Sequence, residues 1–179
     1  MTDRRQFFTA AAIALAWPAG RAQDPAQDPA PLYPKTIVLV RHAEKTTEPA
    51  DDPALSEAGI TRATALATML GKSGVTHLFA SEFERTQATL RPLAQATGVA
   101  VTTAQAADRR GLTTTIDKLP AGAVVVVAGH SNTVPALLAA LTGGQQRIAM
   151  TEAEYDRLFV VTKWGAGPAA TVLELRYQA

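Results

Sequence analysis

The chain has 179 residues, with 17 Lys and Arg against 16 Asp and Glu, and no cysteine. The lack of cysteine excludes disulfides, thiolate metal sites and a cysteine nucleophile. A chain of this length can bury one good hydrophobic core, so we expect a single folded domain.

Residues 1–22 are predicted to be an export signal. Arg4 and Arg5 precede an Ala-rich apolar run that ends at Trp17, a pattern that resembles a twin-arginine signal, and small residues make cleavage after Ala22 plausible. The alternative is a membrane anchor, but the run is shorter than the roughly 20 apolar residues that span a bilayer. We therefore expect a bacterial protein that is periplasmic or secreted, without stable membrane insertion of its mature form.

The mature chain is expected to be nearly neutral. Cleavage removes three Arg and one Asp, which leaves 157 residues with 14 Lys and Arg against 15 Asp and Glu. This balance argues against a nucleic-acid partner. Residues 23–34 repeat Asp-Pro and should form an extended linker, because proline fixes φ and offers no amide donor. The folded domain is expected over residues 35–179.

Strand and helix patterns alternate along this domain. A continuous β-branched run predicts a strand buried on both faces at 36–40. Further strands are predicted at 76–80, 99–102 and 123–129, of which the last has the strongest pattern. Helical patterns lie between and after them, at 56–71, 84–98, 113–119 and 133–144. The chain closes with two strands, 157–163 and 170–177, joined by a hairpin.

The helix patterns also predict caps and core faces. Ser56 is a suitable N-cap and Gly71 a suitable end for the first helix. Its expected core face consists of Ile60, Ala63, Leu66, Ala67 and Leu70, and that of the second helix of Leu90, Leu93, Ala94 and Thr97. Pro135 suits the first turn of the last helix.

This alternation predicts an α/β fold, a three-layer αβα sandwich whose sheet is mostly parallel with an antiparallel edge strand. In such sheets the functional site lies outside the carboxyl ends of the strands. Arg41 and His42, Ser81 and His130 all follow a predicted strand directly. We expect these side chains to meet at one end of the sheet.

Two histidines and several arginines at one crevice favour phosphoryl chemistry. Arginine binds phosphate oxygens in pairs and keeps its charge at any working pH, and Arg41, Arg85 and Arg62 are candidates for this role. A neutral imidazole can attack phosphorus and hold it covalently, while a second, protonated imidazole donates hydrogen bonds to the same oxygens. An acid near the leaving oxygen would complete the set.

Three segments, "LVRHAEK", "SEFERTQATL" and "VAGHSNTVPAL", resemble the motifs of the histidine phosphatase superfamily, the phosphoglycerate mutase-like proteins. The resemblance runs from Thr36 to the last strands, and it implies a phosphatase that needs no metal and no organic cofactor. It also implies that His42 is the phosphorylated nucleophile and that Arg41, Arg85 and His130 complete the phosphate pocket. The expected partner is a small phosphoester or another phosphorylated substrate, and the expected assembly a monomer or weak oligomer.

The acid of this family has no clear counterpart here. Many members carry it in a Glu-rich segment between the second and third motifs, where this chain has only the short segment 102–120. Asp108 is the first candidate, Glu44 the second and Asp117 the third. The short insert predicts an open pocket and a broad substrate preference. Members with such compact inserts include phosphohistidine phosphatases, which need less help with the leaving group.

Some candidates have structural alternatives. Ser81, like Thr86, could bind phosphate or cap the following helix. Arg62 could line the pocket or lie exposed on its helix, and His77 is expected to be structural. Arg85 stands at a helix start, which prefers anions, and a bound phosphate would resolve that conflict.

Three rival functions can be weighed against the sequence. "GHSNT" approaches a nucleophile elbow, but no histidine follows His130 to serve as the base for Ser131. A metal hydrolase could use His42, Glu44 and His130, yet neighbouring arginines would repel a divalent cation. A binding module that kept the pocket and lost turnover remains the alternative, since a clear acid is missing.

Overall fold

The computed structural model describes residues 33–165, 167 and 169–178, which belong to one compact unit, Pro31–Ala179. The expected export signal, 1–22, and all but the last two residues of the expected linker, 23–34, lie outside the described residues. Those boundaries therefore stay predictions.

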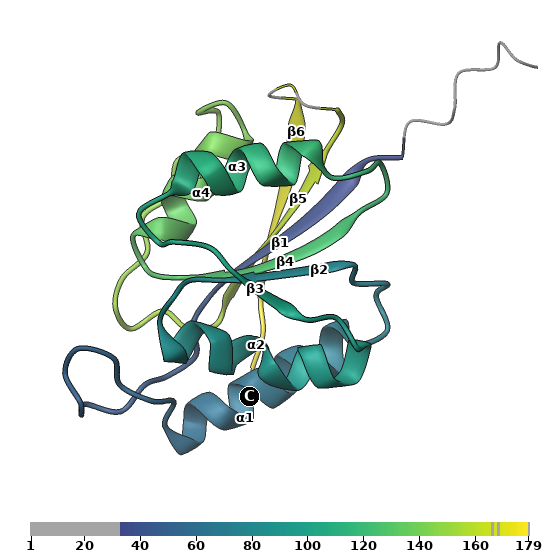
Figure 1. Cartoon of the computed structure of the whole chain (residues 1–179). Helices are drawn as coiled ribbons and strands as arrows, with labels where there is room; N and C mark the ends of the chain where they lie inside the picture. Colours follow the sequence, from purple (N-terminus) through teal and green to yellow (C-terminus); the bar gives the residue numbers. More distant parts are fainter. Residues whose placement is uncertain (1–32, 166, 168, 179) are drawn as a thin grey trace, which may run out of the picture. The chain divides into compact units, whose positions relative to one another are not determined.

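In the described part of the chain six strands form one sheet, in the order β3-β2-β4-β1-β5-β6 (Figure 1). The strands are β1 (Lys35–Arg41), β2 (His77–Ala80), β3 (Val101–Thr103), β4 (Val124–Gly129), β5 (Arg157–Lys163) and β6 (Ala170–Arg176). The first four are parallel, whereas β5 runs antiparallel to both β1 and β6. The predicted mostly parallel sheet with an antiparallel edge is confirmed.

In the described part of the chain helices cover both faces of the sheet, so the domain has three layers (Figure 1). Helices α1 (Glu57–Leu70) and α2 (Glu84–Thr97) pack on one face, and α3 (Arg109–Lys118) and α4 (Thr133–Leu141) on the other. Helix α3 begins four residues before the predicted 113–119, because Asp108 caps it. Among the described residues, no helix is both long and apolar enough to cross a membrane.

The central strand β1 contributes side chains to two separate hydrophobic cores, one on each face of the sheet. Successive side chains of a strand point to opposite faces, so Ile37 and Leu39 pack into the cluster under α3 and α4. Val38 and Val40 enter the cluster under α1 and α2. All four are buried, which explains the unbroken apolar run in the sequence.

One predicted core residue of α1 lies outside. Ile60 is 57% exposed, although Ala63, Leu66 and Ala67 are buried as expected. The reason is the close approach of the helix start to the chain at Glu44, where a Cβ on Gly59 would come 2.1 Å from the Glu44 carbonyl oxygen. Because Gly59 takes the inward position, Ile60 is turned about 100° away from the core.

Candidate active site

The register of β1 and β4 brings the two motif histidines together. Arg41 is paired with Gly129 across these parallel strands, so His42 and His130 each lie one residue beyond a strand end. The His42 amide donates to the Gly129 carbonyl at 2.8 Å, and the two imidazole centroids are 5.3 Å apart. This confirms that the strand ends juxtapose these residues.

His42 is held as a neutral imidazole with one nitrogen engaged. Its Nδ1 lies 2.8 Å from the Ala43 carbonyl oxygen, so Nδ1 carries the proton and donates it there. No described residue hydrogen-bonds to Nε2. Burial lowers the pKa of His42 to about 4, opposed by the bond to Ala43 and assisted by the nearby charge of Arg41. The geometry leaves Nε2 with a free lone pair.

His130 is fixed by a chain of hydroxyl groups. The Thr86 hydroxyl has carbonyl acceptors at Phe83 (2.7 Å) and Ser81 (3.1 Å), so it donates its proton to them. It then accepts from Ser81 Oγ at 2.8 Å, and Ser81 in turn accepts from His130 Nε2 at 2.9 Å. Burial, followed by the charge of Arg85, lowers the pKa of His130 to about 4. This chain fixes the proton of neutral His130 on Nε2.

Ser81 and Thr86 therefore lie behind His130. Both are buried, and neither lines the cavity described below. Neither caps α2, whose N-cap residue Phe83 makes no side-chain cap. The expectation that these hydroxyls cap the helix is wrong, because the Asp52 carboxylate accepts the Glu84 amide there at 2.9 Å.

Asp52 also balances the charge of Arg85, a cation at a helix start that prefers anions. The Arg85 guanidinium donates to Asp52 Oδ1 at 3.1 Å and lies 4.4 Å from the Phe83 ring centroid. A carboxylate of the loop between β1 and α1 thus supplies the anion that the start of α2 prefers.

Arg41 is buried and oriented by the loop that follows α4. Its Nη1 donates to the Thr151 carbonyl at 3.0 Å and its Nη2 to Glu152 Oε2 at 2.6 Å. The guanidinium lies 4.1 Å from the centroid of the Tyr155 ring. Within the described residues, the buried Nε atoms of Arg41 and Arg85 have no hydrogen-bond partner. Each arginine keeps one donor that protein atoms do not satisfy.

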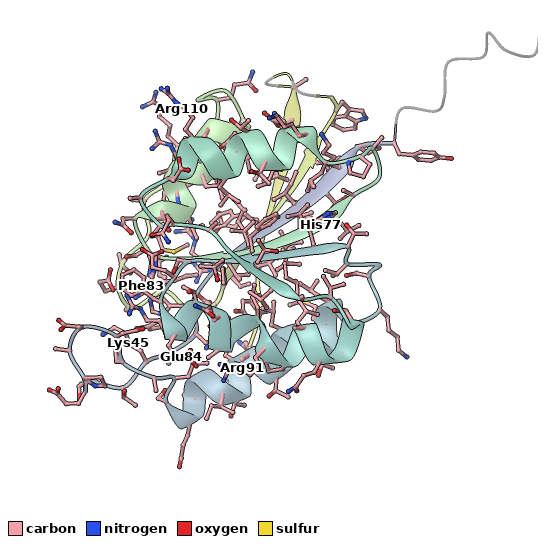
Figure 2. The ribbon with its side chains drawn as sticks, in the orientation of Figure 1. Lys45, His77, Phe83, Glu84, Arg91 and Arg110 are labelled. Atoms are coloured by element: carbon pink, nitrogen blue, oxygen red, sulfur yellow. The ribbon has the colours of Figure 1, made fainter. Side chains whose placement is uncertain are left out.

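A cavity of about 560 Å³ opens at this end of the sheet. It is lined by His42, Lys45, Phe83, Arg85, Ala106, Ala107, His130, Ser131, Asn132, Thr133 and Glu152. Figure 2 shows Lys45 and Phe83 at this end and His77 at the opposite end of the sheet. His77 contacts the Thr76 hydroxyl at 2.8 Å, in agreement with its expected structural role.

Glu44 and Arg62 lie elsewhere. Both Glu44 oxygens accept from Arg62, at 2.7–2.9 Å, and the pair lines a separate cavity with Tyr177. Burial raises the pKa of Glu44, but the hydrogen bonds from Arg62 outweigh it and hold that pKa below its usual value. Neither residue lines the cavity that holds the two histidines, so the structure does not place them where acid or substrate-binding roles were expected.

The other two acid candidates are also engaged in α3. Asp108 is the N-cap, and its Oδ1 accepts the Gly111 amide at 2.8 Å. Asp117 lies near the other end of the helix, with its Oδ1 3.4 Å from Lys163 Nζ. Neither lines the cavity.

The acid that does line the cavity was missed from the sequence. Glu152 accepts hydrogen bonds from the Ser131 hydroxyl and from Arg41. The hydrogen bond from Ser131, opposed by burial and helped by Arg41, holds the pKa of Glu152 below its usual value. Glu152 follows the third motif, whereas the acid was sought before it. The acid-rich "TEAEYD" segment was the available signal.

The described residues contain no group of three His, Asp or Glu side chains arranged to hold a metal ion. Arg85 and Lys45 line the cavity and the charge of Arg41 acts on His42, so the positive groups there favour an anion.

The family model of the histidine phosphatase superfamily (branch 1) matches residues 37–108. The resemblance to this superfamily is confirmed. The matched residues contain Arg41, His42 and Arg85, and the third motif with His130 follows them. Together with the shared fold, this match supports a phosphatase enzyme.

Solved structures share the fold. The protein histidine phosphatase SixA complexed with tungstate has a TM-score of 0.65 and 18% identity, over 79% of this chain and 96% of its own. The putative phosphohistidine phosphatase SixA from Nakamurella multipartitia has a TM-score of 0.60 and 24% identity, over 85% of this chain and 100% of its own. A mycobacterial glucosyl-3-phosphoglycerate phosphatase has a TM-score of 0.60 and 18% identity, over 82% of this chain and 99% of its own. No curated protein matched the chain.

Proposed function

We propose that this chain is a metal-independent phosphatase that hydrolyses phosphomonoesters or phosphohistidine through a covalent phosphohistidine on His42. One observation carries the proposal. His42 is a neutral imidazole whose Nδ1 is tied to Ala43, and it lines the cavity that also holds His130 and Arg85. A nucleophile needs such a free lone pair close to groups that stabilise an anion.

The unsatisfied donors support an oxyanion as ligand. Among the described residues, the Nε atoms of Arg41 and Arg85 have no hydrogen-bond partner, and Arg85 and Lys45 place two positive charges at the cavity. Structures of the same fold are described with tungstate, VO3 and inorganic phosphate. A tetrahedral or trigonal oxyanion would be attracted by these positive charges.

The chemistry then follows in two steps. His42 Nε2 attacks phosphorus, the bond from phosphorus to the leaving group breaks, and the arginines stabilise the charge on the equatorial oxygens. The approach of a phosphate dianion raises the pKa of His130, so that His130 gains a proton and donates a hydrogen bond to the phosphoryl group. Water then hydrolyses the phosphohistidine and releases inorganic phosphate.

None of the described residues that line the cavity is a protonated carboxylic acid, and this narrows the class of substrate. Glu152 is held as an anion, and Asp108, Asp117 and Glu44 are engaged outside the cavity. A leaving group that requires a strong proton donor is therefore disfavoured. Phosphohistidine and activated esters are favoured over simple alkyl phosphates.

The missing proton donor also favours a second candidate function, a module that binds a phosphorylated ligand without turnover. Hydrolysis of p-nitrophenyl phosphate in the presence of EDTA, by the wild type and by His42→Ala, separates the two. EDTA-resistant turnover that His42→Ala loses supports the phosphatase. No turnover, with vanadate or phosphate still raising the melting temperature, supports the binding module.

We also propose that the protein is exported in folded form, on the basis of Arg4, Arg5 and the apolar run after them. Replacement of both arginines by lysine should retain the unprocessed chain in the cytoplasm of a bacterial host. Normal export of that variant would contradict the proposal.

A further inference from the structure

Glu152 has the position and surroundings of a catalytic base. Among the described residues that line the cavity it is the one acid, and His42 lines the same cavity. Its side chain is 76% exposed, although its carboxylate is fixed at both oxygens. An acid held at the mouth of a cavity can exchange protons with both the site and bulk water.

The two hydrogen-bond partners of Glu152 favour the charged form of its carboxylate. The buried Arg41 guanidinium donates to Oε2, and the Ser131 hydroxyl donates to Oε1. Both are donors, so protonation of the carboxylate would disrupt a hydrogen bond. The lowered pKa of Glu152 has the same cause. Such a group is deprotonated at neutral pH, as a general base must be, and it carries no proton to donate to a leaving group.

We propose that Glu152 is the general base for hydrolysis of the phosphohistidine, an inference that rests on the proposed function. The water oxygen attacks phosphorus and one water proton passes to the Glu152 carboxylate. The bond between His42 Nε2 and phosphorus breaks, and its electron pair returns to the imidazole. Glu152 then releases the proton to solvent, and inorganic phosphate leaves.

This assignment separates the two half-reactions. Formation of the phosphohistidine from an activated ester needs no base, because His42 is already neutral. The second step needs one, because water is a weak nucleophile. Loss of Glu152 should therefore slow the second step and spare the first, whereas a role limited to holding Arg41 would weaken phosphate binding and the first step.

The test is rapid-quench kinetics on the whole chain with p-nitrophenyl phosphate, for the wild type, Glu152→Gln and the control Glu57→Gln. Glu57 is exposed in the first turn of α1. We expect Glu152→Gln to release one equivalent of p-nitrophenolate at the wild-type rate, to accumulate acid-labile phosphohistidine, and to hydrolyse it roughly 10²-fold more slowly. Glu57→Gln should match the wild type.

A rescue experiment makes the role of the carboxylate specific. Formate should restore hydrolysis of the phosphohistidine in Glu152→Ala, because the exposed position admits a small carboxylate. Hydrolysis of the phosphohistidine at the wild-type rate in Glu152→Gln would overturn the assignment, as would a defect confined to the first step. Wild-type turnover without any trapped phosphohistidine would instead overturn the covalent mechanism itself.

Discussion

Arg41 and Glu152 form an ion pair with one buried and one exposed partner. The distance from Arg41 Nη2 to Glu152 Oε2 is 2.6 Å, and the two side chains are 1% and 76% exposed. In the free protein Glu152 therefore provides a counter-charge to the buried guanidinium of Arg41. A phosphoryl group that contacts Arg41 would share this role with Glu152.

The first prediction concerns the nucleophile. His42→Ala should lower turnover by at least about 10³-fold and abolish phosphohistidine formation, because the variant lacks the Nε2 atom that attacks phosphorus. His77→Ala is the matched control, since His77 lies at the opposite end of the sheet. Turnover assays and phosphoenzyme trapping check this. Substantial activity in a pure His42→Ala preparation would contradict it.

The second prediction concerns phosphate binding. Arg85→Ala should weaken inhibition by inorganic phosphate by about 10-fold to 100-fold, the loss of one charge-assisted hydrogen-bonding group. The fold should survive, because Asp52 would still cap α2 through the Glu84 amide. Arg91→Ala, an exposed arginine of the same helix, provides the control. Equal inhibition constants in the two variants would exclude Arg85 from the anion site.

The third prediction concerns pH and stability. The pKa of His42 and of His130 is lowered from 6.5 to about 4, so below pH 6.5 the unfolded chain binds more protons than the folded one. Stability should therefore fall as the pH decreases from about 6.5 to about 4, by up to about 1.4 kcal/mol per pH unit for each histidine. Urea denaturation across this range would measure the slope, and His42→Ala should reduce it. An unchanged slope in that variant would contradict the buried, neutral state of His42.

The fourth prediction concerns Ser81 as a positioning residue. Ser81→Ala removes the acceptor for His130 Nε2 and should lower kcat about tenfold, equivalent to one hydrogen bond. The pH dependence of kcat should shift as well, because the tautomer of His130 is no longer fixed. Ser73→Ala, an exposed serine after α1, is the control. A pure loss of stability with an unchanged pH profile would limit Ser81 to packing.

The fifth prediction separates Glu44 from catalysis. Glu44→Gln should lower the free energy of unfolding by about 1–3 kcal/mol, because the half-buried Arg62 loses its charged acceptor. The kcat of the folded enzyme should stay unchanged, since Glu44 does not line the cavity. Chemical denaturation and steady-state kinetics measure the two effects independently. A large fall in kcat without a loss of stability would restore Glu44 as a catalytic acid.

The strand pattern was sufficient to predict the centre of the site. The unbroken apolar runs at 36–40 and 123–129 mark doubly buried strands, and parallel strands of one sheet end at the same edge. His42 and His130 follow those runs directly, so their meeting needs only the adjacency of β1 and β4. The same reasoning could not assign Ile60, because the close approach of Gly59 to Glu44 is a contact between distant segments.

The sequence by itself thus determined the αβα layers and the meeting of the two histidines. Both follow from local hydrophobic periodicity, which shows which strands are buried and how strands alternate with helices. The tertiary structure alone decided which acid faces the cavity. Glu44 pairs with Arg62, Asp108 caps α3, and Glu152 reaches Arg41 from a loop more than a hundred residues away in sequence. The orientation of a loop side chain depends on residues that contact it from other parts of the fold. The spacing of residues along the chain does not predict those contacts.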